Sequence, residues 1–292
     1  MKTPIVAASD FSPAAALAIE RAARMAKQLD CGLRLVHVFN DGIWASVRNI
    51  YDLERWLGGD PVLGVRDRLS QQARDLAARH GIEVVAETLR GDPAAQISAE
   101  AVSANARMLV LGESGESLLG EMLLGGTAQK MLERARLPVL VVRTPTSGNY
   151  QRVMVASDFS QTARRAAELA LEFFADAHHM LLHAYVVQME GRMRMAGATE
   201  EDISRYREQE HERAREAMHE FLAGVSGSAD YERRLAYGFP VGAILDAIAR
   251  SQIDLLVVGK HGGSGLEERL LGSVTQNVLH HASCDVLLVP PA

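Results

Sequence analysis

The sequence predicts an α/β protein built as two tandem, doubly wound domains, each a five-stranded parallel sheet with helices on both faces. Three observations support this fold class. The chain has 292 residues, enough for two domains that each bury a core. It contains one long internal repeat. Within each half, short apolar runs alternate with segments of helical periodicity, which is typical of parallel sheets covered by helices.

The repeat sets the domain boundaries. The segment 5–12 (IVAASDFS) recurs as 153–160 (VMVASDFS), and the apolar run 108–112 recurs as 255–259. Residues 144–149 have linker composition and no periodicity. We therefore predict one domain over residues 1–146 and a second over residues 150–292.

The elements of the first half follow in a regular order. Residues 5–8 read as a buried strand, and Ser12-Pro13 supplies an N-cap and a first-turn proline for a helix that follows. The apolar patterns then predict four strands, at residues 33–39, 84–89, 108–111 and 139–142. They also predict a helix over residues 94–105, opened by Pro93. The second half repeats this order, with a charged surface helix within residues 199–223.

Ligands of such folds bind at the carboxyl ends of the strands. This rule places four residues of the repeat at the expected binding edge: Asp10, Asp158, Gly112 and Gly259.

Composition narrows the class of partner. The net charge is −6, and Lys and Arg are not gathered into a basic segment, so neither nucleic acid nor an anionic membrane is an expected partner. The N-terminus lacks the apolar core of a secretory signal, and no apolar run reaches the ~18 residues of a membrane span. Cys31 and Cys284 suggest no disulfide framework. We expect a cytoplasmic protein.

The segment after the fourth strand of the second half carries the chemistry. It has the form glycine, two residues, glycine, nine residues, Gly-Ser, with glycines at 259, 262 and 272. Such glycines allow backbone N–H groups to form an anion-binding nest, although a plain turn explains the spacing about equally well. Ser273 and Gln276 also read as a capping box that opens a helix, whose N-terminus would attract phosphate. No Walker A motif occurs in the sequence.

At these motifs the chain resembles the universal stress protein family, specifically its ATP-binding branch with the signature G-x2-G-x9-G-[ST]. The resemblance rests on segments 156–160, 182–184, 258–262 and 271–275, which occur in the family's order. It implies that the fifth strands, at residues 140–143 and 286–289, pair within the chain as an intrachain pseudo-dimer. A homodimer of whole chains is left open.

The resemblance also assigns roles in the second domain. It places Asp158 near the ribose or a metal ion bound to the nucleotide, Ala184 against adenine through its backbone, and the phosphate chain on the last four residues of the signature. The implied binding residues for ATP, with Mg, are Ala156, Ser157, Asp158, Ala184, Val258, Gly259, His261, Gly262, Gly272, Ser273, Val274 and Thr275.

The first domain departs from the signature. Gly126 replaces the hydroxyl residue Ser273, which would remove both an N-cap side chain and a phosphate contact. Glu113 and Glu116 add negative charge where a triphosphate would lie. We therefore predict a weaker nucleotide site in this domain, at the equivalent residues Asp10, Val38, Gly112, Gly115, Gly125 and Thr127.

These observations favour a nucleotide-responsive binding module of the stress response, with no catalytic residue assigned. A slow ATPase or phosphotransferase using Asp158 and His261 is the first alternative, and a nucleotide-free scaffold is the second. His37 and His183, which end the second strands, are expected to be hydrogen-bonded pocket residues. The histidine clusters near residues 178–183 and 280–284 lack the spacing of a zinc site.

Overall fold

The computed structural model describes residues 3–40, 61–113, 125–145, 148–187, 189–227, 230–262 and 271–291. The chain divides into two compact units, Met1–Asn149 and Tyr150–Ala292. A side-chain hydrogen bond fixes the chain on each side of this boundary to its own unit. Arg21 donates to the Gly148 carbonyl within the first unit at 2.8 Å, and the buried Tyr150 hydroxyl donates to Asp285 within the second at 2.6 Å.

The first unit alternates strands and helices along the chain, as the apolar pattern predicts. Its strands are all paired in parallel, in the order β3-β2-β1-β4-β5. The elements are β1 (Ile5–Ala8), α1 (Pro13–Gln28), β2 (Leu33–Phe39), α4 (Pro61–His80), β3 (Val84–Arg90), α5 (Pro93–Ser103), β4 (Met108–Gly112), α6 (Gly126–Glu133) and β5 (Val139–Val142).

The second unit repeats this plan, with strand order β8-β7-β6-β9-β10 and parallel pairing throughout. The elements are β6 (Arg152–Ala156), α7 (Gln161–Phe173), β7 (His178–Tyr185), α8 (Glu190–Met195), α9 (Glu200–Ala223), β8 (Tyr231–Tyr237), α10 (Pro240–Ser251), β9 (Leu255–Gly259), α11 (Ser273–His281) and β10 (Asp285–Val289). The predicted fold class, two domains of five parallel strands flanked by helices, is confirmed.

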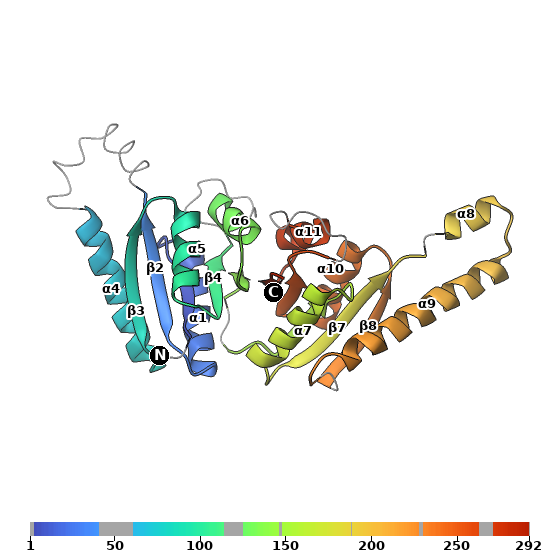
Figure 1. Cartoon of the computed structure of the whole chain (residues 1–292), viewed down its shortest axis with the longest axis horizontal. Helices are drawn as coiled ribbons and strands as arrows, with labels where there is room; N and C mark the ends of the chain where they lie inside the picture. The colour runs from blue at the N-terminus through green and yellow to red at the C-terminus, as the bar shows by residue number, and fades with distance from the viewer. Residues whose placement is uncertain are drawn as a thin grey trace. The chain divides into compact units, whose positions relative to one another are not determined.

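Helices cover both faces of each sheet. In the first unit α1 and α4 contact each other on one face, and α5 and α6 contact each other on the opposite face. In the second unit Arg164 of α7 lies over the Phe221 ring of α9, and α10 contacts α11. The helix α9 continues past the end of β8 and reaches α8 (Figure 1). Burial on both faces explains why the inner strands read as uninterrupted apolar runs.

The position of the binding edge follows from the strand order. From β1 the chain passes to β2 on one side, whereas β4 lies on the other side, and β6 has the same relation to β7 and β9. Helices that leave adjacent strands in opposite directions leave a crevice at the carboxyl ends of those strands. Each unit therefore has one such crevice. Among the described residues, no helix is both long enough and apolar enough to cross a membrane.

Candidate functional site

A cavity of about 360 Å³ lies at the crevice of the second unit. It is formed by the carboxyl ends of β6, β7 and β9 and by the first turns of α10 and α11. Every second-domain residue that the sequence nominates lines it: Ala156, Ser157, Asp158, Ala184, Val258, Gly259, His261, Gly262, Gly272, Ser273, Val274 and Thr275.

The turn after β6 builds one wall. The backbone N–H of Phe159 donates to Ser157 Oγ at 3.0 Å, and that of Ser160 donates to Asp158 Oδ1 at 3.1 Å. Ser160 Oγ then accepts from the N–H of Ala163 at 3.2 Å and caps α7. These bonds fix the exposed Asp158 carboxylate at the rim of the cavity, before a well-capped helix.

His183 ties this turn to the neighbouring strand. Its Nδ1 donates to the Ser157 carbonyl at 2.8 Å, and its ring stacks on Phe159 with centroids 4.1 Å apart. Burial lowers the pKa of His183, although the bond to Ser157 and the charge of Asp158 partly oppose that shift. The prediction that this histidine is a hydrogen-bonded pocket residue is confirmed, and the same bond occurs between His37 and Ser9 at 2.8 Å.

Two glycines of this wall have side chains of neighbouring residues packed close to them. A Cβ on Gly262 would lie 2.5 Å from Asp158 Oδ2, and a Cβ on Gly259 would lie 3.0 Å from the Thr162 methyl group. The glycine signature therefore reflects tight packing as well as the shape of the cavity.

The first turn of α11 builds the opposite wall. The predicted capping box is wrong, because Gly272 is the N-cap residue and Ser273 is the first residue of the helix, with no side-chain cap bond. The cause is the bond from the Gly272 N–H to the Lys260 carbonyl at 3.0 Å, which holds Gly272 extended at the entrance to the helix. Thr275 Oγ1 donates to the Gly259 carbonyl at 2.8 Å and anchors the helix to β9.

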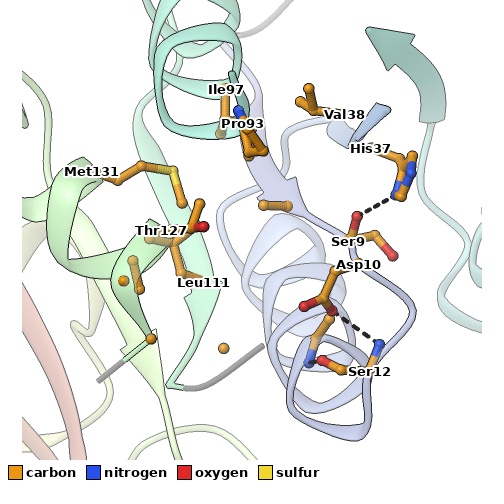
Figure 2. A pocket seen from close by; sticks show the side chains of 16 residues that line it. Ser9, Asp10, Ser12, His37, Val38, Pro93, Ile97, Leu111, Thr127 and Met131 are labelled. Atoms are coloured by element: carbon orange, nitrogen blue, oxygen red, sulfur yellow. Dashed lines mark hydrogen bonds between the residues drawn. The ribbon is translucent and has the colours of Figure 1, made fainter. Parts of the chain in front are cut away.

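The first unit has a matching cavity of about 310 Å³ (Figure 2). Five of the six nominated residues line it, namely Asp10, Val38, Gly112, Gly125 and Thr127. Gly115 and Glu116 lie outside the described residues. Figure 2 shows Ser9, Asp10 and His37 on one side of the cavity, with Thr127 and Met131 on the other.

Two expectations for the first unit need correction. Gly126 removes no cap, because Gly125 is the N-cap residue of α6, just as Gly272 is for α11. Glu113 does not line the cavity, since its carboxylate pairs with Arg143 at 3.3 Å. The backbone of Glu113 holds the place of Lys260, since its carbonyl accepts from the Gly125 N–H at 2.9 Å.

Sequence reasoning missed the apolar part of both linings. Pro240, Ile244 and Leu182 line the second cavity, and Pro93 and Ile97 hold the equivalent places in the first. The recurrence of a proline four residues before an isoleucine was the signal that could have found them. Among the residues described, no group of three or more His, Cys, Asp or Glu is placed to hold a metal ion.

Comparison with known proteins agrees with the repeat. The model of the Universal stress protein family matches residues 1–143 and again 149–290. A universal stress protein of Mycolicibacterium smegmatis is 28% identical over 305 residues, covering 98% of this chain and 97% of its own. One from Mycobacterium tuberculosis is 34% identical over 143 residues, covering 48% of this chain and 96% of its own.

A solved structure supports the fold across the full length. The crystal structure of a universal stress protein from Archaeoglobus fulgidus aligns over 100% of both chains with a TM-score of 0.66, at 18% identity. The family model matches both halves of the chain, each half has the five-stranded parallel sheet, and the chain therefore belongs to the universal stress protein family, with the domain present twice.

Proposed function

We propose that the second domain binds an adenine nucleotide, ATP together with magnesium, in the cavity between β6, β7 and β9. The domain then acts as a regulatory or signalling module in the stress response. The observation that carries the proposal is the first turn of α11. Its residues line the cavity, and no side chain caps its backbone N–H groups. Uncapped N–H groups and the helix dipole stabilise phosphate at such a position.

The remaining lining suits the other parts of a nucleotide. Pro240, Ile244 and Val258 provide apolar surface for a purine, and the backbone at Ala184 offers the hydrogen-bonding groups that distinguish one base from another. Asp158 lies at the rim, where its carboxylate would hold the magnesium ion that neutralises the phosphates. Ser273 adds an exposed hydroxyl that has no hydrogen-bond partner within the described chain.

The same lining favours binding over turnover. Hydrolysis needs a base or a water-orienting group near the γ-phosphate. The described titratable residues of the lining are Asp158, His183 and His261, and His183 already uses its Nδ1 in the bond to the Ser157 carbonyl. We therefore propose a module that holds its nucleotide, with slow ATPase activity as the alternative.

The test is calorimetric titration of the whole chain with Mg-ATP, followed by chromatography of the nucleotide over several hours. Ser273→Ala should weaken ATP binding about tenfold, because hydrogen bonds to charged groups contribute roughly 1.5–3 kcal/mol. The matched control is Ser283→Ala, an exposed serine outside the cavity.

Each outcome has a separate meaning. Binding of unconverted ATP that Ser273→Ala weakens supports the module. Conversion to ADP that follows occupancy of the site would replace it with the ATPase. No binding by the wild-type chain would overturn the proposal and favour the scaffold.

A further inference from the structure

The two cavities share most of the residues of one wall. Several lining residues are of the same type in both units. They include the serine and aspartate of the turn, the histidine that bonds to that turn, the proline and isoleucine of the facing helix, and two glycines. These pairs are Ser9 and Ser157, Asp10 and Asp158, His37 and His183, Pro93 and Pro240, Ile97 and Ile244, Gly112 and Gly259, and Gly125 and Gly272. The shared residues include the ribose end and part of the base end of the site proposed above, while Val38 and Leu111 stand where the second unit has Ala184 and Val258.

The opposite wall keeps an uncapped helix start in the first unit, but its side chains have changed. The helix α6 carries Gly126 and Ala128 where α11 carries Ser273 and Thr275. The hydroxyls of Ser273 and Thr275 are therefore missing, although Thr127 places a hydroxyl where α11 has Val274. The bond that anchors α11 through Thr275 to the β9 carbonyl has no side-chain equivalent at Ala128.

Two larger side chains also occupy this cavity. The Met131 thioether, from the second turn of α6, points into it (Figure 2), whereas the equivalent Val278 of α11 does not line the second cavity. Val38 stands where the second unit has Ala184. The first cavity is accordingly smaller, about 310 Å³ against about 360 Å³.

The first cavity keeps a carboxylate that suits the hydroxyls of a sugar. Asp10 Oδ1 accepts from the Ser12 N–H at 2.9 Å, and Oδ2 has no hydrogen-bond partner among the described residues. Asp10 is the one carboxylate among the described lining residues, as Asp158 is in the second cavity, and neither lining includes Lys or Arg. A polar anchor beside an apolar slot of this size is the usual form of a small neutral-ligand site.

We propose that the first-domain cavity binds a nucleoside without a phosphate chain, so that one chain holds a nucleotide and a nucleoside at separate sites. The inference rests on the proposed function of the second domain, because it carries the base and ribose end of that site across to the first. It assigns the first domain a ligand class of its own in place of a weakened ATP site.

Adenosine and Mg-ATP are the two probes, titrated separately into the whole chain by calorimetry. The wild-type chain should bind one equivalent of ATP and two of adenosine, and one equivalent of adenosine should still bind when ATP is saturating. Two equal ATP sites would overturn the inference, and so would adenosine that ATP displaces completely. If ATP binds while adenosine adds no second equivalent, the inference fails and the proposed function stands. If neither probe binds, both fail.

A blocking pair of variants locates the adenosine. Thr127 lines the first cavity from an exposed position, and Val274 is its equivalent in the second. Thr127→Trp should remove the ATP-insensitive adenosine equivalent and leave ATP binding within twofold. Val274→Trp should do the reverse. Loss of ATP binding in Thr127→Trp would contradict the assignment of the two ligands to two cavities.

A reciprocal exchange tests the wall that differs. The double variant Ser273→Gly/Thr275→Ala removes both of these hydroxyls from the second cavity, and it should weaken ATP binding at least tenfold while adenosine stays at two equivalents. The triple variant Gly126→Ser/Ala128→Thr/Met131→Val gives the first cavity the other wall and should raise the ATP stoichiometry above one. Circular dichroism, and in the triple variant the unchanged second site, would show that the variants fold. If folded variants kept the wild-type ATP affinity and the wild-type ATP stoichiometry, this wall would not be what separates the two ligands.

Discussion

At the residue scale, the most informative cluster is the histidine, phenylalanine and serine group found once in each unit. Phe11 and Phe159 have left-handed backbones, with φ of 62° and 64°, which L-residues adopt at a cost of roughly 1–2 kcal/mol. Their rings lie on His37 and His183, at centroid distances of 4.9 and 4.1 Å. The stacking and the histidine bonds to the serine carbonyls hold a turn that the backbone alone disfavours.

These histidines make stability depend on pH. Burial lowers the pKa values of His37, His179 and His183 in the folded chain. The unfolded chain, with a histidine pKa near ~6.5, then binds more protons than the folded chain as the pH falls. We therefore expect the free energy of unfolding to be highest above pH ~6.5. It should fall as the pH drops from there toward the lower pKa values of the folded chain.

The measurement is urea unfolding of the whole chain at pH 7 and pH 5.5. His183→Asn, whose amide can donate from the position of Nδ1, should show a smaller loss between the two pH values than the wild type does. His219→Asn, at an exposed histidine of α9, is the control and should keep the wild-type difference. An equal loss in wild type and His183→Asn would rule out this histidine as a source.

A second residue-scale prediction concerns glycine packing. A Cβ on Gly112 would come within 2.7 Å of the Ala14 backbone, whereas one on Gly126 would meet nothing within 4 Å. Gly112→Ala should lower the free energy of unfolding by about 1–3 kcal/mol through overpacking. Gly126→Ala should leave it unchanged or raise it by about 0.5 kcal/mol. Denaturant titration of the two variants side by side checks the difference, and equal values would refute it.

At the element scale, the helices begin in two ways. Ser12, Asp92, Ser160 and Thr199 cap α1, α5, α7 and α9 through their side chains. The helices α6, α10 and α11, whose first residues line the cavities, begin at Gly125, Phe239 and Gly272 without a side-chain cap. Each cavity therefore has at least one uncapped helix start in its lining, although the capped helices α1, α5 and α7 also begin beside the cavities.

The pair Asp92 and Phe239 allows a direct test, because the two residues hold the same place in the repeat. Asp92 accepts from the Ala95 N–H at 2.9 Å, and Phe239 is 78% exposed with no cap bond. Asp92→Ala should lower the free energy of unfolding by about 1 kcal/mol, and Phe239→Asp should raise it by a similar amount. Thermal unfolding of both variants gives the comparison, and a destabilised Phe239→Asp would show that the exposed ring contributes more than a cap would.

The elements also show how far sequence reasoning reached. Strand limits at residues 5–8, 33–39 and 139–142 were predicted as observed, because buried strands of a parallel sheet are bounded by polar turns. The start of α11 was placed one residue too far along. A serine attracts the N-cap assignment in sequence, but the backbone bond between Gly272 and Lys260, which decides the matter, joins residues twelve apart.

At the scale of the whole molecule, each cavity is lined by residues of a single unit. The repeat and the alternation of elements predicted this plan, since a motif that recurs with its flanking strands recurs as a complete site. The sequence could not predict where the Glu113 carboxylate lies. Its partner Arg143 follows a different strand, and only the folded sheet brings the two residues together.

This plan predicts that ligand binding survives separation of the units. A fragment of residues 150–292 should bind Mg-ATP within about threefold of the whole chain, and residues 1–149 should bind none. Calorimetry on each fragment, with circular dichroism to establish folding, makes the measurement. A folded 150–292 fragment that binds ATP more than tenfold weaker would show that the first unit contributes to the nucleotide site.

The stacked turn described above has an evolutionary consequence. In each unit the phenylalanine ring contacts the histidine, and the histidine bonds to the serine carbonyl, so a change at one of these positions disturbs two chain segments at once. Both copies have this arrangement. The first turns of α6 and α11 carry less of this mutual constraint, since among their lining side chains Thr275 of α11 is tied to another segment but its equivalent in α6 is Ala128. New ligand preferences in a duplicated chain of this kind would therefore arise on the helix side, while the turn side is inherited unchanged.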